Sequence, residues 1–183
     1  VEWPWGFRME ADGLWYDQPQ QNGGLAPMRL SDPFEVIGEA RDPDGGGWAV
    51  VLRFRDRDGK EKEVVVAKSR LASGAAEALA ELAGAGLAVP MTRGKAEKFT
   101  VALSEVKCAR RLTLVGATGW CGDRFVLPGH DVGPVGGESV LFTGTSPALH
   151  YRRRGDLAAW RAGVAVKAVG NDLLAFALSL AFL

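Results

Sequence analysis

Hydrophobic and polar residues alternate along the first third of the chain, a pattern typical of β-strands joined by tight turns. Asp12 and Gly13 separate two short hydrophobic runs, Phe7–Met9 and Leu14–Tyr16. Two such runs on either side of an Asp-Gly pair predict a hairpin. The polar stretch Gln18–Pro27 that follows is predicted to be a loop.

A second group of strands follows this loop. Pro33–Ile37 begins one strand, and Trp48–Arg55 forms the next. In Trp48–Arg55 the residues Val50, Leu52 and Phe54 share one face, and the opposite face carries Val51, Arg53 and Arg55. This alternation predicts a half-buried antiparallel strand. A tight turn then leads into Val64–Val66, so the first third predicts a meander of about five strands.

Helical periodicity replaces the alternation in the middle of the chain. Ser73 is suited to cap a helix that Gly84 can end. A second helix is predicted from Lys95, because four apolar residues recur at helical spacing: Phe99, Ala102, Leu103 and Val106. Strands are predicted again at 112–117 and 125–127.

These elements predict three successive parts. Residues 1–128 form a mixed α+β domain, with strands over about 5–67, helices over about 73–109 and strands over about 112–127. Residues 129–155 form a Gly- and Pro-rich connector with one strand, Ser139–Phe142. Residues 156–183 form a helical segment whose first helix Asp156 can cap. The expected fold class is α+β, an N-terminal antiparallel β-meander packed with helices and followed by a C-terminal helical segment.

The end of the sequence predicts a helix that is apolar on all sides. Asn171 is suited to cap it, Asp172 to its first turn, and Ser179 is the only polar residue after that. We expect this helix to pack beneath a region that continues the chain, or against a partner, and to drive self-association when uncovered. The expected interface residues are Leu173, Leu174, Phe176, Leu178, Leu180, Phe182 and Leu183.

Composition narrows the class of protein. The 22 Lys and Arg residues balance the 22 Asp and Glu residues, which argues against a protein dedicated to coating nucleic acid. Two cysteines without CxxC spacing are typical of a reducing, cytoplasmic protein, and no signal peptide is visible. The terminal apolar run is well short of the roughly 20 residues that span a bilayer. We therefore expect no membrane contact.

The sequence carries no recognisable catalytic signature. The motifs GxSxG, HExxH and GK[ST] are absent, so no residue is assigned a catalytic role. His130 and His150 have no partners at metal-ligand spacing, so we expect neither a metal nor a cofactor in this chain.

Clustered basic residues suggest contact with nucleic acid, because fixed guanidinium groups suit phosphate. The candidates are Arg53, Arg55, Lys107, Arg110, Arg111, Arg152, Arg153 and Arg154. A solvated face or intramolecular ion pairs would explain the same residues equally well. The aromatic residues near the N-terminus, Trp3, Trp5, Phe7, Trp15 and Tyr16, could stack on bases, although packing in a core or interface is the favoured interpretation.

Several stretches together resemble a known family. They are 5–9 with 13–17, 32–38 with 48–59, 118–120 with 125–128, and finally Trp160 with 168–171 and the terminal helix. Their order and spacing resemble the domain of unknown function numbered nine hundred twenty-seven. That family occurs in proteins of phages, plasmids and integrated elements that are often described as primase- or helicase-like. The motifs are structural Trp, Gly and Pro residues.

The resemblance implies that a P-loop ATPase follows this region in fuller members, so ATP and Mg²⁺ would belong to that downstream region. The chain is then expected to be a non-catalytic accessory domain of a mobile-element helicase- or primase-like ATPase. It would engage nucleic acid, in the first place DNA, or couple or oligomerise the motor. Its partners would be the downstream ATPase region, DNA or a second copy. The alternative is a protein–protein interaction module that binds no nucleic acid.

Overall fold

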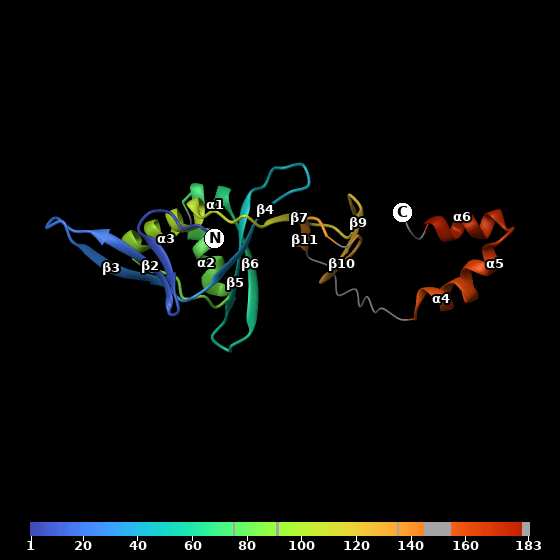
Figure 1. The fold of residues 1–183 in the computed structure, drawn as a ribbon, viewed down its shortest axis with the longest axis horizontal. Helices are drawn as coiled ribbons and strands as arrows, with labels where there is room; N and C mark the ends of the chain where they lie inside the picture. Colours follow the sequence, from blue (N-terminus) through green and yellow to red (C-terminus); the bar gives the residue numbers. More distant parts are fainter. Residues whose placement is uncertain (75, 91, 135, 145–154, 181–183) are drawn as a thin grey trace. The chain divides into compact units, whose positions relative to one another are not determined.

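The computed structural model describes residues 1–74, 76–90, 92–134, 136–144 and 155–180. The chain divides into two compact units, Val1–Ser146 and Pro147–Leu183, and each is described by itself. The first unit combines β-sheets with helices, and the second is helical (Figure 1). This confirms the predicted α+β class and the C-terminal helical segment.

The first sheet has three antiparallel strands in the order β1-β2-β3. They are β1 (Phe7–Glu10), β2 (Gly13–Pro19) and β3 (Leu25–Ser31). The predicted hairpin at Gly13 is confirmed. The predicted loop over Gln18–Pro27 is wrong at both ends, because β2 continues to Pro19 and β3 begins at Leu25. The half-exposed side chains of β3 gave no clear hydrophobic alternation.

The second sheet has five strands in the order β11-β7-β4-β5-β6. They are β4 (Glu35–Arg41), β5 (Ala49–Arg55), β6 (Glu61–Ala67), β7 (Arg111–Val115) and β11 (Ser139–Phe142). The β4/β5 and β5/β6 pairs are antiparallel, whereas β7 lies parallel to both β4 and β11. The first six strands are therefore divided between two sheets and do not form a single meander.

A small third sheet follows, with antiparallel order β10-β9-β8. Its strands are β8 (Gly119–Cys121), β9 (Arg124–Leu127) and β10 (His130–Val132). The helices of this unit are α1 (Lys68–Ala72), α2 (Ala76–Gly84) and α3 (Arg93–Glu105). The prediction that Ser73 caps the second of these is wrong. Ser73 ends α1, and its hydroxyl donates to the Arg70 carbonyl at 3.2 Å.

One hydrophobic core joins the first sheet, the three helices and one face of the five-stranded sheet. Figure 1 shows the helices between the β2–β3 hairpin and strands β4–β6. Phe99 of α3 lies at the centre of this core, fully buried and edge-on to Phe34 with ring centroids 6.0 Å apart. The predicted stripe on α3 is confirmed as its buried face.

The opposite face of the five-stranded sheet has a core of its own, formed by Ile37, Ala40, Val51 and Leu112. Val51 is fully buried there, while its neighbours Val50 and Leu52 are fully buried in the first core. The prediction of a half-buried strand is therefore wrong for the first half of β5, because both of its faces are covered.

The second unit consists of α4 (Leu157–Trp160), a π-helical turn (Arg161–Ala165), α5 (Val166–Ala168) and α6 (Asp172–Leu180). Both predicted caps are confirmed. The Asp156 carboxylate accepts from the Ala159 N–H at 2.8 Å, and the Asn171 side chain accepts from the Leu174 N–H at 3.1 Å. None of the helices in the described part of the chain has the length and apolar character to cross a membrane.

Candidate nucleic-acid interface

The short segment between α3 and β7 is fixed at several points of its backbone. Val106 is fully buried and leaves the helical conformation, which ends α3 at Glu105. The next residue, Lys107, exchanges two backbone hydrogen bonds with Glu2, at 2.8 and 3.0 Å. The Arg110 carbonyl then accepts from the Glu39 N–H at 3.1 Å. The segment Lys107–Arg110 therefore has a fixed course, although it lies outside regular secondary structure.

Glu39 of β4 organises the inner side of this segment. Its carboxylate is almost fully buried and lies 2.6 Å from Lys68 Nζ and 2.9 Å from an Arg111 guanidinium nitrogen. The Cys108 N–H also donates to it at 3.4 Å. Burial raises the pKa of the Glu39 carboxyl, but the Lys68 and Cys108 hydrogen bonds and the charges of Lys68 and Arg111 leave this pKa below its ordinary value. Glu39 is thus an anion held by two cations.

Trp48 contacts two guanidinium groups beside this cluster. The Arg41 and Arg111 guanidinium carbons are 5.8 and 5.6 Å from the centre of its ring, within the range of cation–π contact. Arg41 also forms a two-point ion pair with Glu138, whose second partner is the Thr113 hydroxyl at 3.0 Å. Both arginines are held in place by carboxylates, and Trp48 is 41% exposed.

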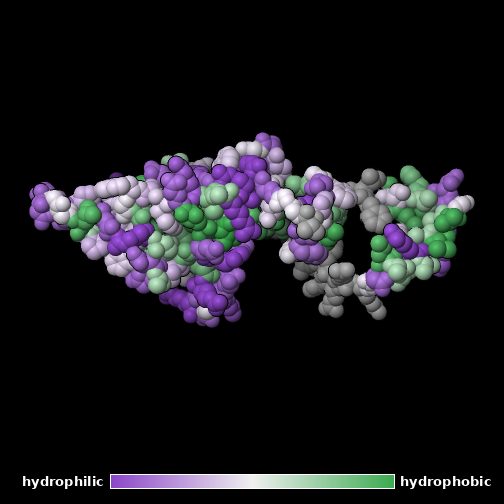
Figure 2. Space-filling view, in the orientation of Figure 1, coloured by the Kyte–Doolittle hydropathy of each residue, from purple (hydrophilic) through white to green (hydrophobic). Residues whose placement is uncertain are grey.

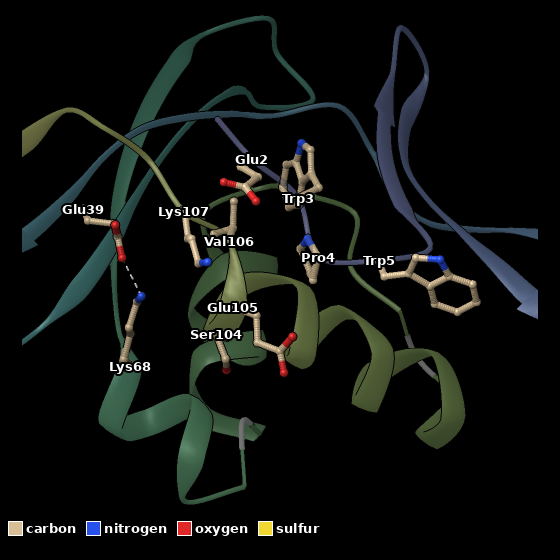
Figure 3. Close-up of a pocket in the computed structure, with 10 residues that line it drawn as sticks. All are labelled: Glu2, Trp3, Pro4, Trp5, Glu39, Lys68, Ser104, Glu105, Val106 and Lys107. Atoms are coloured by element: carbon tan, nitrogen blue, oxygen red, sulfur yellow. Dashed lines mark hydrogen bonds and ion pairs between the residues drawn. The ribbon is translucent and has the colours of Figure 1, made fainter.

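A shallow pocket of about 570 Å³ lies beside the fixed segment (Figure 3). Its lining includes Lys107, Trp5 and the Glu39–Lys68 ion pair. Trp5 is 75% exposed, so its side chain is accessible to a ligand. Two further carboxylates, Glu2 and Glu105, also line the pocket and make its charge mixed.

The structure separates the predicted basic residues into three groups. In the first group the side chains bind other parts of the chain. Arg53 lies 2.7 Å from Glu63 and within 4 Å of Glu35 and Glu61. Arg55 donates to the Gly59 carbonyl at 3.3 Å. Arg111 binds Glu39. In the second group are Lys107 and Arg110, which have no acidic side-chain partner among the described residues. Arg152, Arg153 and Arg154 lie outside the described residues.

The N-terminal aromatic residues divide in the same way. Trp3, Phe7 and Tyr16 pack in or against the first core, as the favoured interpretation expected. Trp5 does not pack there and is 75% exposed, and no local pattern in the sequence distinguishes it from Trp3. Glu39, Trp48 and Glu138 were not among the predicted site residues. Their relevance depends on pairing between strands far apart in the sequence, which no local pattern reports.

The predicted interface residues of the last helix lie on α6, apart from Phe182 and Leu183, which are outside the described residues. Leu173, Leu174, Phe176 and Leu180 are exposed, and Leu178 is partly buried. Figure 2 shows hydrophobic surface over this helical unit. Whether another region covers these side chains remains a prediction of the sequence.

Comparison with known proteins places the chain in a family. No curated protein matches it by sequence. A solved structure described as "SCCmec type IV Cch - active helicase" is similar, at 13% identity and a TM-score of 0.46; the similarity covers 91% of this chain and 30% of that one. A family model described as "Domain of unknown function (DUF927)" matches residues 7–183. Since that match covers almost the whole chain, the protein belongs to the DUF927 family.

Proposed function

We propose that this chain is a non-catalytic accessory domain of a mobile-element helicase- or primase-like ATPase, and that it contacts nucleic acid through the segment Lys107–Arg110. One observation carries the proposal. Within the described residues, Lys107 and Arg110 lack an acidic partner, and their backbone is fixed to Glu2 and Glu39. Because the backbone of this segment is already fixed, phosphate binding would have to order only the two side chains and would cost little backbone entropy.

One neighbouring residue, Trp5, supports the same function, although the pocket's three carboxylates, Glu2, Glu39 and Glu105, outnumber its two lysines. Trp5 lines the same pocket as Lys107, and its exposed ring, which points away from Lys107 in Figure 3, offers a flat surface on which a base can stack. Arg53 and Arg111, in contrast, are already paired with carboxylates, so that phosphate would have to displace an internal ion pair. We therefore assign phosphate contact to Lys107 and Arg110 and leave Arg53, Arg55 and Arg111 as structural residues.

The proposal has four further parts. The chain is part of an ATPase, the ATPase belongs to a mobile element, it acts in DNA replication, and it is located in the cytoplasm. Their support is the family membership together with the resemblance described above. ATP and Mg²⁺ are assigned to a downstream P-loop region, and the apolar residues of α6 to contact with that region. A longer protein that continues past Leu183 should hydrolyse ATP, and nucleic acid should stimulate the hydrolysis.

The test is a measurement of binding by fluorescence anisotropy, with labelled single-stranded and duplex DNA over a range of salt concentrations. Wild-type affinity should fall steeply as salt rises. The double variant K107E/R110E should bind at least about tenfold more weakly at low salt. The matched control is R57E/K60E, which makes the same change of charge in the exposed β5–β6 turn and should bind like the wild type.

Two results would contradict the proposal. If the two double variants lose the same DNA affinity, then binding depends on the net charge of the protein and not on Lys107 and Arg110. Absence of binding to any DNA at low salt would favour the alternative, a protein–protein interaction module. That alternative is supported by the exposed apolar side chains of α6, and sedimentation of the chain with its downstream region would then be the informative measurement.

A further inference from the structure

The two edge strands of the five-stranded sheet lie next to the same groove. Among the described strands, β6 pairs only with β5, and β11 pairs only with β7. The edges nevertheless converge, because Val65 of β6 and Leu141 of β11 both pack against the second core. A groove of about 680 Å³ lies between them and is lined by Val65, Ala67, Leu114, Leu141 and Phe142, with Ala85 of α2 beside it. The sheet thus curls so that its edges face a common space.

The two edges also run in the same direction. β5 is antiparallel to both β4 and β6, so β6 runs parallel to β4. β7 is parallel to β4, and β11 is parallel to β7. One added strand would therefore meet both edges in the same relative orientation. Unpaired strand edges are templates for such addition, and proteins normally cover them or place charges on them.

The charges at one end of the groove favour a basic occupant. Three carboxylates, Glu35, Glu61 and Glu63, surround Arg53, and Glu63 also lines the groove. Arg55 lies opposite Glu61 in the register of the two strands and carries the second guanidinium group on this face. On the face of the sheet that these residues share, the three carboxylates exceed the two guanidinium groups, whereas Lys62 alternates to the other face of β6 and lies 3.9 Å from Asp56. The remaining charged pair of the groove, Arg70 and Glu81, is internally neutral at 2.8 Å.

We propose that the groove between β6 and β11 binds an extended segment of another protein chain, which adds a strand to the sheet. Apolar side chains at alternate positions of that segment contact Val65 and Leu141, and a lysine or arginine lies near Glu63. Backbone hydrogen bonds to the edge of β6 supply affinity, and the apolar contacts supply register. This protein-binding site is separate from the segment Lys107–Arg110.

The probe is an acetylated heptapeptide amide, Lys-Val-Thr-Val-Thr-Val-Lys, added to the chain at up to millimolar concentration. Amide signals of β6 and β11 should shift in NMR spectra, and exchange of β6 amides should slow by about tenfold. A peptide with proline at the central position should produce neither effect, since proline cannot donate to the ladder. Binding that leaves β6 and β11 unchanged, or absence of binding at millimolar peptide, would overturn the proposal.

Two variants identify the site. Leu141→Glu should abolish binding by placing a charge on the apolar floor. Because that variant could lose its fold, Glu63→Lys supplies an independent test at a partly exposed position. It should weaken the lysine-flanked peptide about tenfold and strengthen a glutamate-flanked version. The control is Glu97→Lys, a carboxylate that also pairs with an arginine but lies on α3 and should leave both affinities unchanged.

A second copy of the chain is the other occupant to examine. Sedimentation equilibrium without peptide should show no dimer that depends on the groove. A concentration-dependent dimer that Leu141→Glu removes would assign the groove to a second copy and overturn the proposed partner.

Discussion

The Arg111 guanidinium lies 2.9 Å from the Glu39 carboxylate, and this ion pair joins β7 to β4 at the point where the sheet changes from antiparallel to parallel pairing. Lys68, which directly follows β6, binds the same carboxylate at 2.6 Å. One side chain therefore connects three parts of the chain that are distant in the sequence.

We predict that Glu39→Ala destabilises the first unit by about 2 kcal/mol, because the substitution leaves Lys68 and Arg111 without their anion. The cost stays below that of a fully buried pair because both cations are partly exposed and can be hydrated. Urea unfolding followed by tryptophan fluorescence measures this change. Glu97→Ala, which breaks an exposed pair with Arg93, should cost less than about 0.5 kcal/mol. Equal effects would contradict the assigned role of Glu39.

The lowered pKa of Glu39 predicts a pH dependence of stability. The ionised carboxylate stabilises the folded state above its unfolded pKa, about 4.3, and this stabilisation is lost as the pH falls through the lower folded value. The difference in unfolding free energy between wild type and Glu39→Gln should be constant from about pH 8 to 5 and shrink below about pH 4. Urea titrations at each pH test this expectation. A difference that grows on acidification would show that the pKa is raised.

Phe99→Ala should destabilise the first unit by about 3–5 kcal/mol, since Phe99 is fully buried between the helices and the sheets. The control is Val101→Ala on the same helix, where the side chain is 40% exposed and the expected cost is below about 0.5 kcal/mol. Both values come from urea unfolding. A small cost at Phe99 would mean that it does not lie at the centre of the core.

Substitutions at Gly13 and Gly59 distinguish two effects of an added β-carbon, namely backbone strain at positive φ and a clash with a neighbouring strand. Both have positive φ, 144° and 76°, but a β-carbon at Gly13 would lie 1.8 Å from the Ser31 carbonyl oxygen, whereas the space at Gly59 is open. Gly59→Ala should cost about 1 kcal/mol from backbone strain alone. Gly13→Ala should cost more than about 3 kcal/mol, because β2 and β3 must separate. Thermal unfolding compares the two, and equal costs would exclude the close approach of β2 and β3.

Trp5→Ala should weaken binding of single-stranded DNA about tenfold without changing the salt dependence, because stacking involves no counterion release. Lys107→Ala should instead reduce the slope of log affinity against log salt by about 0.7. Trp120→Ala serves as the control, since Trp120 is 57% exposed but lies on β8. A change of slope in Trp5→Ala would contradict stacking.

The sequence predicted most elements of the fold because their signals are local. The Asp12-Gly13 turn, the α3 stripe and the caps at Asp156 and Asn171 each depend on residues a few positions apart. β3 was missed for the same reason. Its stability comes from pairing with β2, and its own side chains alternate between exposed and half-buried without a clear apolar face.

The candidate site was less predictable. Arg110 and Arg111 are adjacent in the sequence and looked equivalent, yet Arg111 binds Glu39 while the Arg110 side chain has no acidic partner in the described parts of the chain. Arg53 seemed equally available, but Glu35 and Glu63 lie opposite it on the two neighbouring strands. Strand order and register decide which basic side chains have an acidic partner. Neither can be read from the sequence of a single strand.

The burial of the first half of β5 on both faces and along both edges has a kinetic consequence. An amide in Ala49–Leu52 does not reach solvent by fraying of an edge or by movement of one helix, because β4, β6 and the two cores enclose this part of the strand. Its hydrogen exchange should then report unfolding of the entire first unit. The exchange rates of the β5 amides therefore serve as an internal reference. A peptide that slows exchange in β6 but not in β5 acts locally. A peptide that slows exchange in both strands equally raises the stability of the whole unit.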